Sequence, residues 1–426
     1  MIENKFKSLN EKAALGRCFL TLILSLLFVL PGNLFFITSA FSAEVDSFTQ
    51  RHQLSDSRSA LNTVVNLWLI EAIAEANRKS KLLSLTKKEQ FDEDDFFLNE
   101  NTSKSKLENK PFQDKHEQAN KDKIPQENRQ KAELNVENGE NNENEQTAQC
   151  SRPVLFNSLK DKFAGFLIGQ LETYVNNSNT LDTIKVNFKD SIYRDFKLSE
   201  TPTISFTEKL SAIVRIRDTY FGADKFGHFF TEGLSYYEIV TTINQSSALQ
   251  FGELSENFLY GELTTGVYSY SDLAANLNGL RFWNRILALK PDPLYPGTSS
   301  TPYVSCINNQ WQQTEHFDWA EYVDPTWDEA INCSAFRNDV LLDKVKSNIK
   351  NATGGKNCPL AHIQQKPLVE KYGNLLSHLY NPNGNMVVTA PLRPKFNLLW
   401  SNIVGVINSR ILPEGFKSPT FLSNDN

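Results

Sequence analysis

The feature that most constrains the fold is a long polar stretch that cannot take part in a hydrophobic core. Residues 87–149 are dominated by Asn, Glu, Lys, Gln and Asp. Such a composition buries too little apolar surface to offset the entropy lost on ordering the chain, so we expect a disordered, low-complexity linker. It is either a tether or a tolerated insertion. The fold must then come from an N-terminal helical segment, residues 44–86, and one domain that begins at residue 150.

The N-terminus has the pattern of a secretion signal. Basic residues come first, an apolar run covers residues 18–30, and small residues follow. The pattern predicts cleavage after Ala40, Ser42 or Ala43. The alternative is that residues 1–43 remain as an N-terminal anchor, which would then be the chain's contact with a membrane. In both cases we expect an exported protein, periplasmic or associated with the cell envelope.

Cysteine usage agrees with export. Four cysteines follow the signal: Cys150, Cys306, Cys333 and Cys358. An even number in an exported chain predicts two disulfides, with three ways of pairing them. A zinc site is the alternative, but the gaps are long and irregular and there is no Cys-x-x-Cys pair. The sequence therefore favours disulfides and leaves their pairing open.

The predicted fold class is mainly α. Apolar periodicity indicates an irregular helical bundle over residues 150–300, followed by a loop-rich, disulfide-stapled part of the same domain over residues 301–426. The net charge of −6 and the pI near 5.7 argue against a nucleic-acid partner. Besides the central stretch described below, helices are expected at residues 59–76, 153–175, 211–216, 249–263, 269–289, 369–379 and 398–411.

The C-terminal part is rich in aromatic residues, which have two interpretations. They form either a binding surface or the core of an irregular, disulfide-linked region. We favour the core, because such regions need large side chains to fill them. The residues concerned are Trp311, Phe317, Trp319, Tyr322 and Trp327.

The central stretch, residues 223–232, carries three ionisable side chains at a spacing of four: Asp224, His228 and Glu232. On a helix this spacing drifts by only about 40° per step, so all three lie on one face, opposite several phenylalanines. The three are candidate ligands of a divalent metal. His228 is alternatively a proton-transfer group oriented by a carboxylate. In the structural alternative, Asp224 caps the helix and the other two face water.

A second polar face follows in the chain. Ser269 is a good N-cap, and Asp272 stands three residues later, as in a capping box. Asp272, Asn276 and Gly279 share one helix face, and the glycine would let another helix approach closely. Glu262 lies just before the turn into this helix. We therefore expect two polar helix faces to meet.

The order of these residues resembles VanZ-like proteins and the YfiM-like bacterial envelope lipoproteins. The pattern is Asp-Lys-x-x-His-Phe, an acid before a Gly turn, then Ser-x-x-Asp-x-x-x-Asn-x-x-Gly, over roughly residues 220–285. Three departures stand out: Thr265 replaces the usual Gln, no Arg precedes the serine, and the helices are too short and polar for the membrane-embedded VanZ-like proteins. The resemblance implies an envelope context and a polar helical site, not an activity. The matching residues are Asp224, Lys225, His228, Glu262, Gly266, Ser269, Asp272, Asn276 and Gly279.

Two functions are consistent with these patterns. The first is an exported envelope protein whose polar site binds a small ligand or an envelope partner. The second is a metal-dependent hydrolase acting on an envelope lipid or glycan; Lys225 would then pair with a phosphate or carboxylate, rather than being a solvated charge. The distance from His228 to Asp272 and Glu262 separates the two hypotheses. The candidate catalytic residues are Asp224, Lys225, His228, Glu262, Asp272 and Asn276, and the candidate metal ligands are Asp224, His228 and Glu232.

Overall fold

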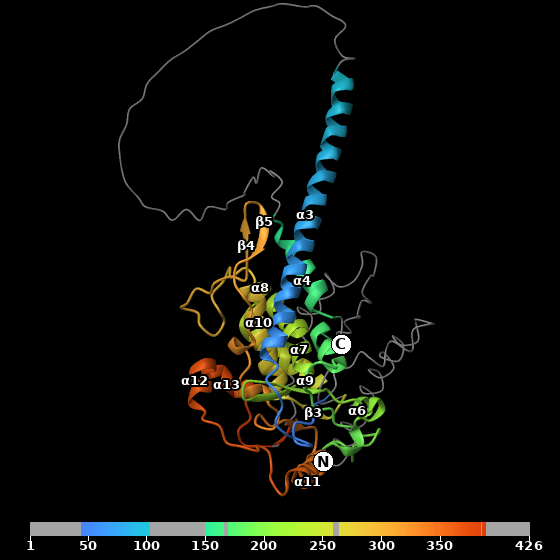
Figure 1. Ribbon diagram of the computed structural model, residues 1–426, viewed down its shortest axis with the longest axis vertical. Helices are drawn as coiled ribbons and strands as arrows, with labels where there is room; N and C mark the ends of the chain where they lie inside the picture. Colours follow the sequence, from blue (N-terminus) through green and yellow to red (C-terminus); the bar gives the residue numbers. More distant parts are fainter. Residues whose placement is uncertain (1–43, 103–149, 166–168, 259–263, 385, 389–426) are drawn as a thin grey trace, which may run out of the picture.

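Helices predominate in the computed structural model, which confirms the mainly α class (Figure 1). Within the described ranges, no helix is both long enough and apolar enough to cross a membrane. The structure describes residues 44–102, 150–165, 169–258, 264–384 and 386–388, with the backbone alone over residues 85–102.

The helices and strands are short apart from α3. The helices are α3 (Arg58–Thr102), α4 (Arg152–Phe163), α5 (Gln170–Asn177), α6 (Pro202–Thr207), α7 (Asp224–Gly227), α8 (Gly233–Thr242), α9 (Gln245–Phe258), α10 (Tyr270–Arg285), α11 (Asp339–Thr353), α12 (Lys366–Tyr372) and α13 (Leu376–Leu379). The short 3-10 turns are η1 (Phe188–Asp190), η3 (Trp319–Glu321), η4 (Pro325–Trp327) and η5 (Gly373–Leu375), and η2 (His228–Glu232) is a π turn.

Three small sheets accompany the helices. Strands β1 (Ile213–Ile216) and β2 (Thr219–Gly222) form an antiparallel hairpin, as do β4 (Val304–Ile307) and β5 (Gln310–Gln313). In the third sheet, β6 (Ala335–Phe336) pairs antiparallel with β3 (Val267–Tyr268) and parallel with β7 (Met386–Val387). The sheets thus tie together segments that are far apart in the sequence.

Helix α10 lies at the centre of the fold and is buried along nearly its whole length. The continuous helical run α7–η2–α8 packs along it, and α9 contacts both α8 and α10. The two runs cross at Gly233 and Gly279. A Cβ on Gly279 would lie 1.9 Å from the carbonyl oxygen of Phe229 and 2.8 Å from Cα of Gly233. The close approach expected at Gly279 is therefore present, and it brings the two polar helix faces together.

The aromatic residues of the C-terminal part are core residues. The side chains of Trp319 and Trp327 are fully buried, and the ring of Phe229 lies 4.9 Å from that of Trp319, centroid to centroid. The rings of Phe317 and Tyr322 stack at 5.4 Å. These contacts confirm the expected core, and they fasten residues 311–327 onto the helical run that carries the candidate site.

Helix α3 is longer than expected. Its buried residues include Leu61, Leu69 and Ala76, and it contacts α4, β5 and η3, so this segment docks on the main domain. The helix continues to Thr102, past the expected end at Ala76, and its far part extends beyond the body of the protein (Figure 1). Residues 77–102 contain no Pro or Gly and many good helix formers, which accounts for the continuation. The rest of the expected linker, residues 103–149, lies outside the described residues.

Two helix predictions were wrong next to the candidate site. The single helix expected at residues 153–175 is divided into α4 and α5, because the backbone is extended at Ala164 and Gly169. The break sets Gly169 against the backbone of Gly227. The helix expected at residues 211–216 is instead strand β1, where β-branched residues pair with β2.

Other predictions fail in part. The helix expected at residues 369–379 is interrupted at Gly373, whose φ of 55° a continuing helix cannot adopt. Helix α11 and the β4–β5 hairpin lie in the part expected to be irregular. The helix expected at residues 249–263 corresponds to α9 as far as Phe258, and residues 259–263 lie outside the described residues. The helix expected at residues 398–411 lies wholly outside them.

The four cysteines form two disulfides, which settles the choice against a zinc site. Cys150 is joined to Cys306, and Cys333 to Cys358. The first bond links the start of α4 to strand β4, and the second holds the segment after η4 to the loop after α11. Both act on segments that pack around α10.

Candidate functional site

The β1–β2 hairpin ends at Gly222, two residues before Asp224. The backbone N–H of Asp224 donates to Ser211 Oγ at 2.9 Å, and one turn of α-helix follows. The helix then widens into the π turn, closed by a bond from the Gly233 N–H to the carbonyl oxygen of His228. A π turn inside a helix is rare and occurs often at functional sites. Here Asp224, His228 and Glu232 are all buried on the side that faces α10.

Lys225 is fully buried and pairs with three carboxylates. Its Nζ lies 2.6 Å from Asp224 Oδ2, 2.5 Å from Asp272 Oδ1 and 2.7 Å from Glu329 Oε1. Burial alone would lower the pKa of Lys225, but the three carboxylates raise it well above its ordinary value. Lys225 is thus paired with carboxylates of the protein itself and is not a solvated charge.

His228 lies between two carboxylates. Its Nδ1 is 2.9 Å from Glu232 Oε2, and its Nε2 is 3.1 Å from Asp272 Oδ2. Asn276 Nδ2 donates to the same oxygen of Glu232 at 3.0 Å. Burial alone would lower the pKa of His228, but Asp272 and Glu232 raise it well above its ordinary value. Glu232 and Asn276 therefore orient the ring so that Nε2 points to Asp272.

The hydrogen bonds at the start of α10 explain why the Asp272 carboxylate can contact His228. Ser269 caps the helix as expected, since its Oγ accepts from the Asp272 N–H at 3.3 Å. In a capping box the Asp272 carboxylate would accept from the Ser269 N–H. That N–H instead donates to Glu256 Oε1 at 3.2 Å. Glu256 thus replaces Asp272 in the cap, and the Asp272 carboxylate turns towards Lys225 and His228.

Three of the buried side chains lie close enough together to hold a metal ion. Asp224, His228 and Asp272 each offer one ligand atom, and these atoms lie within 4.8 Å of one another. His228 Nε2 contacts Asp272 Oδ2 but makes no aligned hydrogen bond. Within the described part of the chain, Asp224 Oδ1 also accepts no hydrogen bond. Buried polar atoms without a hydrogen-bond partner are rare in folded proteins, which marks this group as a candidate functional site.

The group of potential metal ligands differs in one position from the set expected from the sequence. Asp224 and His228 belong to the three-residue group, whereas Glu232 lies at the opposite nitrogen of the imidazole. Such a carboxylate fixes the orientation of a metal-binding histidine from behind. Asp272, predicted as a catalytic residue, is the third member of this group.

Further acidic residues that the sequence patterns did not single out complete the cluster. Burial raises the pKa of Glu329 to about 7, against the opposing effect of Lys225. Burial and then Asp224 raise the pKa of Glu172 to about 8. Burial and then Asp272 hold the pKa of Glu256 well above its ordinary value. Partly exposed Glu44 interacts electrostatically with Glu329.

One local signal for Glu172 exists in the sequence. Gly227 stands within the central stretch, and a Cβ there would lie 2.3 Å from Glu172 Oε2. The missing side chain is what admits this carboxylate. Glu329 lies two residues after Trp327. Nothing in its spacing links it to Lys225, more than one hundred residues earlier.

The cluster is short of positive charge. Within the described residues, two cationic groups, Lys225 and His228, face seven carboxyl groups. Because several of these carboxyls have raised pKa values, the metal-free site holds protons that a cation could replace. The carboxyl groups belong to Glu44, Glu172, Asp224, Glu232, Glu256, Asp272 and Glu329.

Of the predicted site residues, Asp224, Lys225, His228, Asp272 and Asn276 come together. Glu262 lies outside the described residues. No family model, curated protein or solved structure matches this chain, so its site is interpreted from its own chemistry.

Proposed function

We propose that this chain is an exported cell-envelope protein that binds a divalent metal ion at a buried site formed by Asp224, His228 and Asp272. The observation that carries the proposal is the convergence of three ligand atoms within 4.8 Å between two helical runs. One imidazole and two carboxylates suit Zn²⁺, Mn²⁺ or Fe²⁺ better than Ca²⁺ or Mg²⁺, which prefer oxygen ligands alone.

Export is supported by two independent features. The N-terminal sequence has the order of a secretion signal. The two disulfides are typical of an oxidising compartment outside the cytoplasm. The resemblance to VanZ-like and YfiM-like proteins adds an envelope context, because the residues that carry it include all three proposed ligands.

The surrounding residues would support the ion in distinct ways. Glu232 and Asn276 hold the His228 ring with Nε2 towards the ligand position. Lys225 neutralises the second oxygen of Asp224 and one oxygen of Asp272, so that these carboxylates do not repel each other fully. Because Asp224 and His228 are only 2% exposed, the position between them is suited to a single ion.

Metal analysis of the purified protein tests this proposal. We expect about one equivalent of metal per chain, with affinity falling at least about a hundredfold in Asp224→Asn and Asp272→Asn. Glu232→Gln should lose about tenfold to a hundredfold, since it removes only the orienting carboxylate. Binding would be followed by isothermal titration calorimetry with Zn²⁺ and Mn²⁺.

Asp324→Asn is the matched control. Asp324 is a partly buried carboxylate paired with a lysine, Lys371, at 2.6 Å, and it is not among the three proposed ligands. This variant should keep its metal while losing some stability. Equal metal content and affinity in wild type, Asp224→Asn and Asp272→Asn would refute the site.

A metal-dependent hydrolase acting on an envelope lipid or glycan is the second candidate. The short contact between Asp272 and His228 favours it, as does Glu256, whose pKa is raised well above its ordinary value by burial and then by Asp272. A bound metal with three protein ligands keeps a coordination position open, which is the arrangement of catalytic zinc sites. Turnover of an envelope substrate that is lost in Asp272→Asn and kept in Asp324→Asn would establish this activity; metal binding without turnover would leave the binding function.

A further inference from the structure

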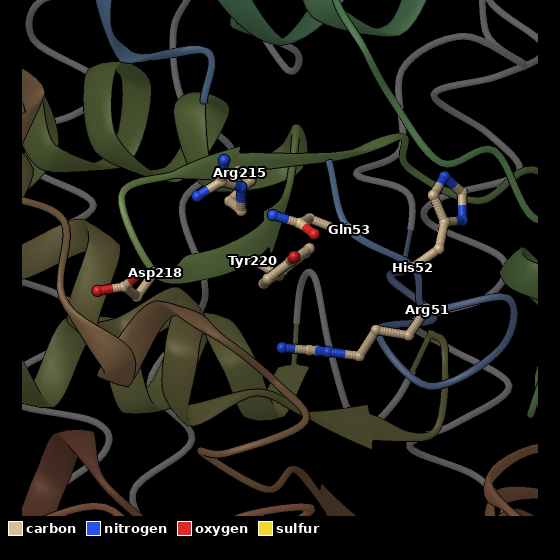
Figure 2. Close-up of a pocket in the computed structure, with 6 residues that line it drawn as sticks. All are labelled: Arg51, His52, Gln53, Arg215, Asp218 and Tyr220. Carbon is tan, nitrogen blue, oxygen red and sulfur yellow. The ribbon is translucent and has the colours of Figure 1, made fainter. Parts of the chain in front are cut away.

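A polar cleft opens beside the β1–β2 hairpin (Figure 2). Its volume of about 440 Å³ is within the usual range for small-molecule sites. The cleft is separate from the three proposed metal ligands, and none of them lines it. The lining residues are Arg51, His52, Gln53, Arg215, Asp218 and Tyr220.

Both arginines of the cleft are held in place by the protein. Arg51 forms a two-point ion pair with Asp328, at 3.1 Å and 2.5 Å, and its guanidinium lies 4.4 Å from the centre of the Tyr220 ring. Arg215 donates from Nε to the Leu54 carbonyl and from Nη1 to the Arg217 carbonyl. Less side-chain entropy is therefore lost when a ligand binds these groups.

The positive charge of Arg215 is not neutralised by an ion pair. Among the described residues, no carboxylate lies within ion-pair distance of its guanidinium, and its Nη2 donates no hydrogen bond. A guanidinium carries five N–H donors, so Arg215 keeps several for a ligand. Arg51 retains its Nε donor in addition.

The two guanidinium groups approach the cleft from opposite sides of Tyr220 (Figure 2). A planar carboxylate matches one guanidinium fork, whereas a tetrahedral phosphate dianion presents oxygens in several directions. Tyr220 and Gln53 add hydroxyl and amide donors to the same wall. Asp218, at one end, is suited to accept from a hydroxyl or amine next to the phosphate.

We infer that this cleft binds the phosphate group of a small molecule or lipid headgroup, with Arg215 as the principal contact. This site goes beyond the proposed metal-binding function and does not depend on it. The phosphate could come from a soluble phosphomonoester or from a lipid that exposes one, and the experiment separates these sources.

The first test is calorimetric titration of the full chain with inorganic phosphate and with glycerol 3-phosphate, at constant ionic strength. Both should bind, and acetate should bind at least about tenfold more weakly. Arg215→Gln should lose at least about tenfold in phosphate affinity. Arg194→Gln is the matched control, because Arg194 is also partly buried and donates to a backbone carbonyl, that of Ser191, outside the cleft.

The second variant, Asp218→Asn, should change phosphate affinity in the opposite direction to Arg215→Gln. Asp218 is exposed, so Asp218→Asn should fold normally and, by removing a negative charge, raise phosphate affinity about threefold to fivefold. This result remains informative if Arg215→Gln folds poorly. No binding by wild type at about 10 mM phosphate, equal affinity in Arg215→Gln, or weaker binding in Asp218→Asn would overturn the inference.

Vesicle sedimentation identifies the source of the phosphate. Vesicles that contain phosphatidic acid expose a phosphomonoester, whereas pure phosphatidylcholine vesicles do not. Sedimentation that needs phosphatidic acid and is lost in Arg215→Gln would assign a lipid headgroup. Binding of glycerol 3-phosphate without sedimentation would assign a soluble ligand.

Discussion

At Lys225, unfavourable burial of a charge is opposed by favourable ion pairing. Burying an ammonium group is unfavourable by several kcal/mol, and the burial is sustained here by three carboxylate contacts of 2.5–2.7 Å. The same contacts keep Asp224, Asp272 and Glu329 from facing one another unpaired. Lys225 therefore holds the negatively charged cluster together, while the Nε2 of His228 faces Asp272.

Glu172 makes the stability of the metal-free protein depend on pH. Its pKa is about 8 in the folded state and about 4.5 ordinarily, so the folded chain keeps a proton that the unfolded chain loses. The folded state binds more protons between these values, and stability must therefore fall as pH rises from about 4.5 to about 8. Glu172→Gln, which cannot ionise, should be more stable than wild type at pH 8 by roughly 2–4 kcal/mol and nearly equal to it below pH 5.

Urea unfolding of the metal-free protein at several pH values measures this difference. Glu208→Gln is the control, because Glu208 is exposed. It should track wild type at every pH. A stability difference between Glu172→Gln and wild type that stays constant from pH 5 to pH 8 would contradict the assignment.

At the scale of elements, the site depends on how closely the η2–α8 run approaches α10. This approach occurs at Gly233 and Gly279, next to Asn276. The π turn lies directly before this crossing, because it ends at Glu232 and Gly233 follows it. Two backbone features, a helix irregularity and a glycine contact, thus bring His228 within reach of Asp272.

Gly279→Ala tests this crossing. The added Cβ would overlap the Phe229 carbonyl oxygen, so the helices must separate, at a cost of about 3 kcal/mol or more. The separation should also weaken metal binding. Gly297→Ala is the control, since no atom lies within 4 Å of its Cβ position, and it should change stability by less than about 0.5 kcal/mol. Urea unfolding and calorimetry measure both effects; a stable Gly279→Ala variant with normal metal affinity would show that the close crossing is not needed.

At the scale of the whole molecule, the disulfides connect distant segments around α10. Cys150 and Cys306 are separated by 156 residues, and Cys333 and Cys358 by 25 residues. In the chain-entropy account, the longer loop contributes about 5 kcal/mol and the shorter about 3.5 kcal/mol.

We therefore expect the double variant Cys150→Ala/Cys306→Ala to lose more stability than Cys333→Ala/Cys358→Ala. The second pair lies next to the segment that carries Glu329, since Cys358 Sγ is 3.6 Å from the Glu329 carbonyl oxygen. Its loss should accordingly affect metal affinity more than the loss of the first pair. Thermal unfolding and metal titration of both variants test the two orders, and the reverse order in either measurement would contradict them.

The sequence by itself determined the location of the candidate site and the class of the fold. Spacings of three and four residues are local, so they correctly placed Asp224 and His228 on one helical run and Asp272 and Asn276 on another. The Ser269 cap and the contact at Gly279 could be predicted for the same reason. Where local preferences compete, prediction failed: residues 213–216 pair as a strand, and extended backbone at Ala164 and Gly169 divides the helix expected at residues 153–175.

Only the tertiary structure decided which acids complete the site. Glu172, Glu256 and Glu329 come from separate segments, and their raised pKa values exist only because folding removes them from water together. The cysteine pairing, and the exchange of Asp272 for Glu256 at the cap of α10, likewise depend on contacts between distant segments. Periodicity shows which face of a helix a side chain occupies, but the partner that faces it is set by packing across the whole chain.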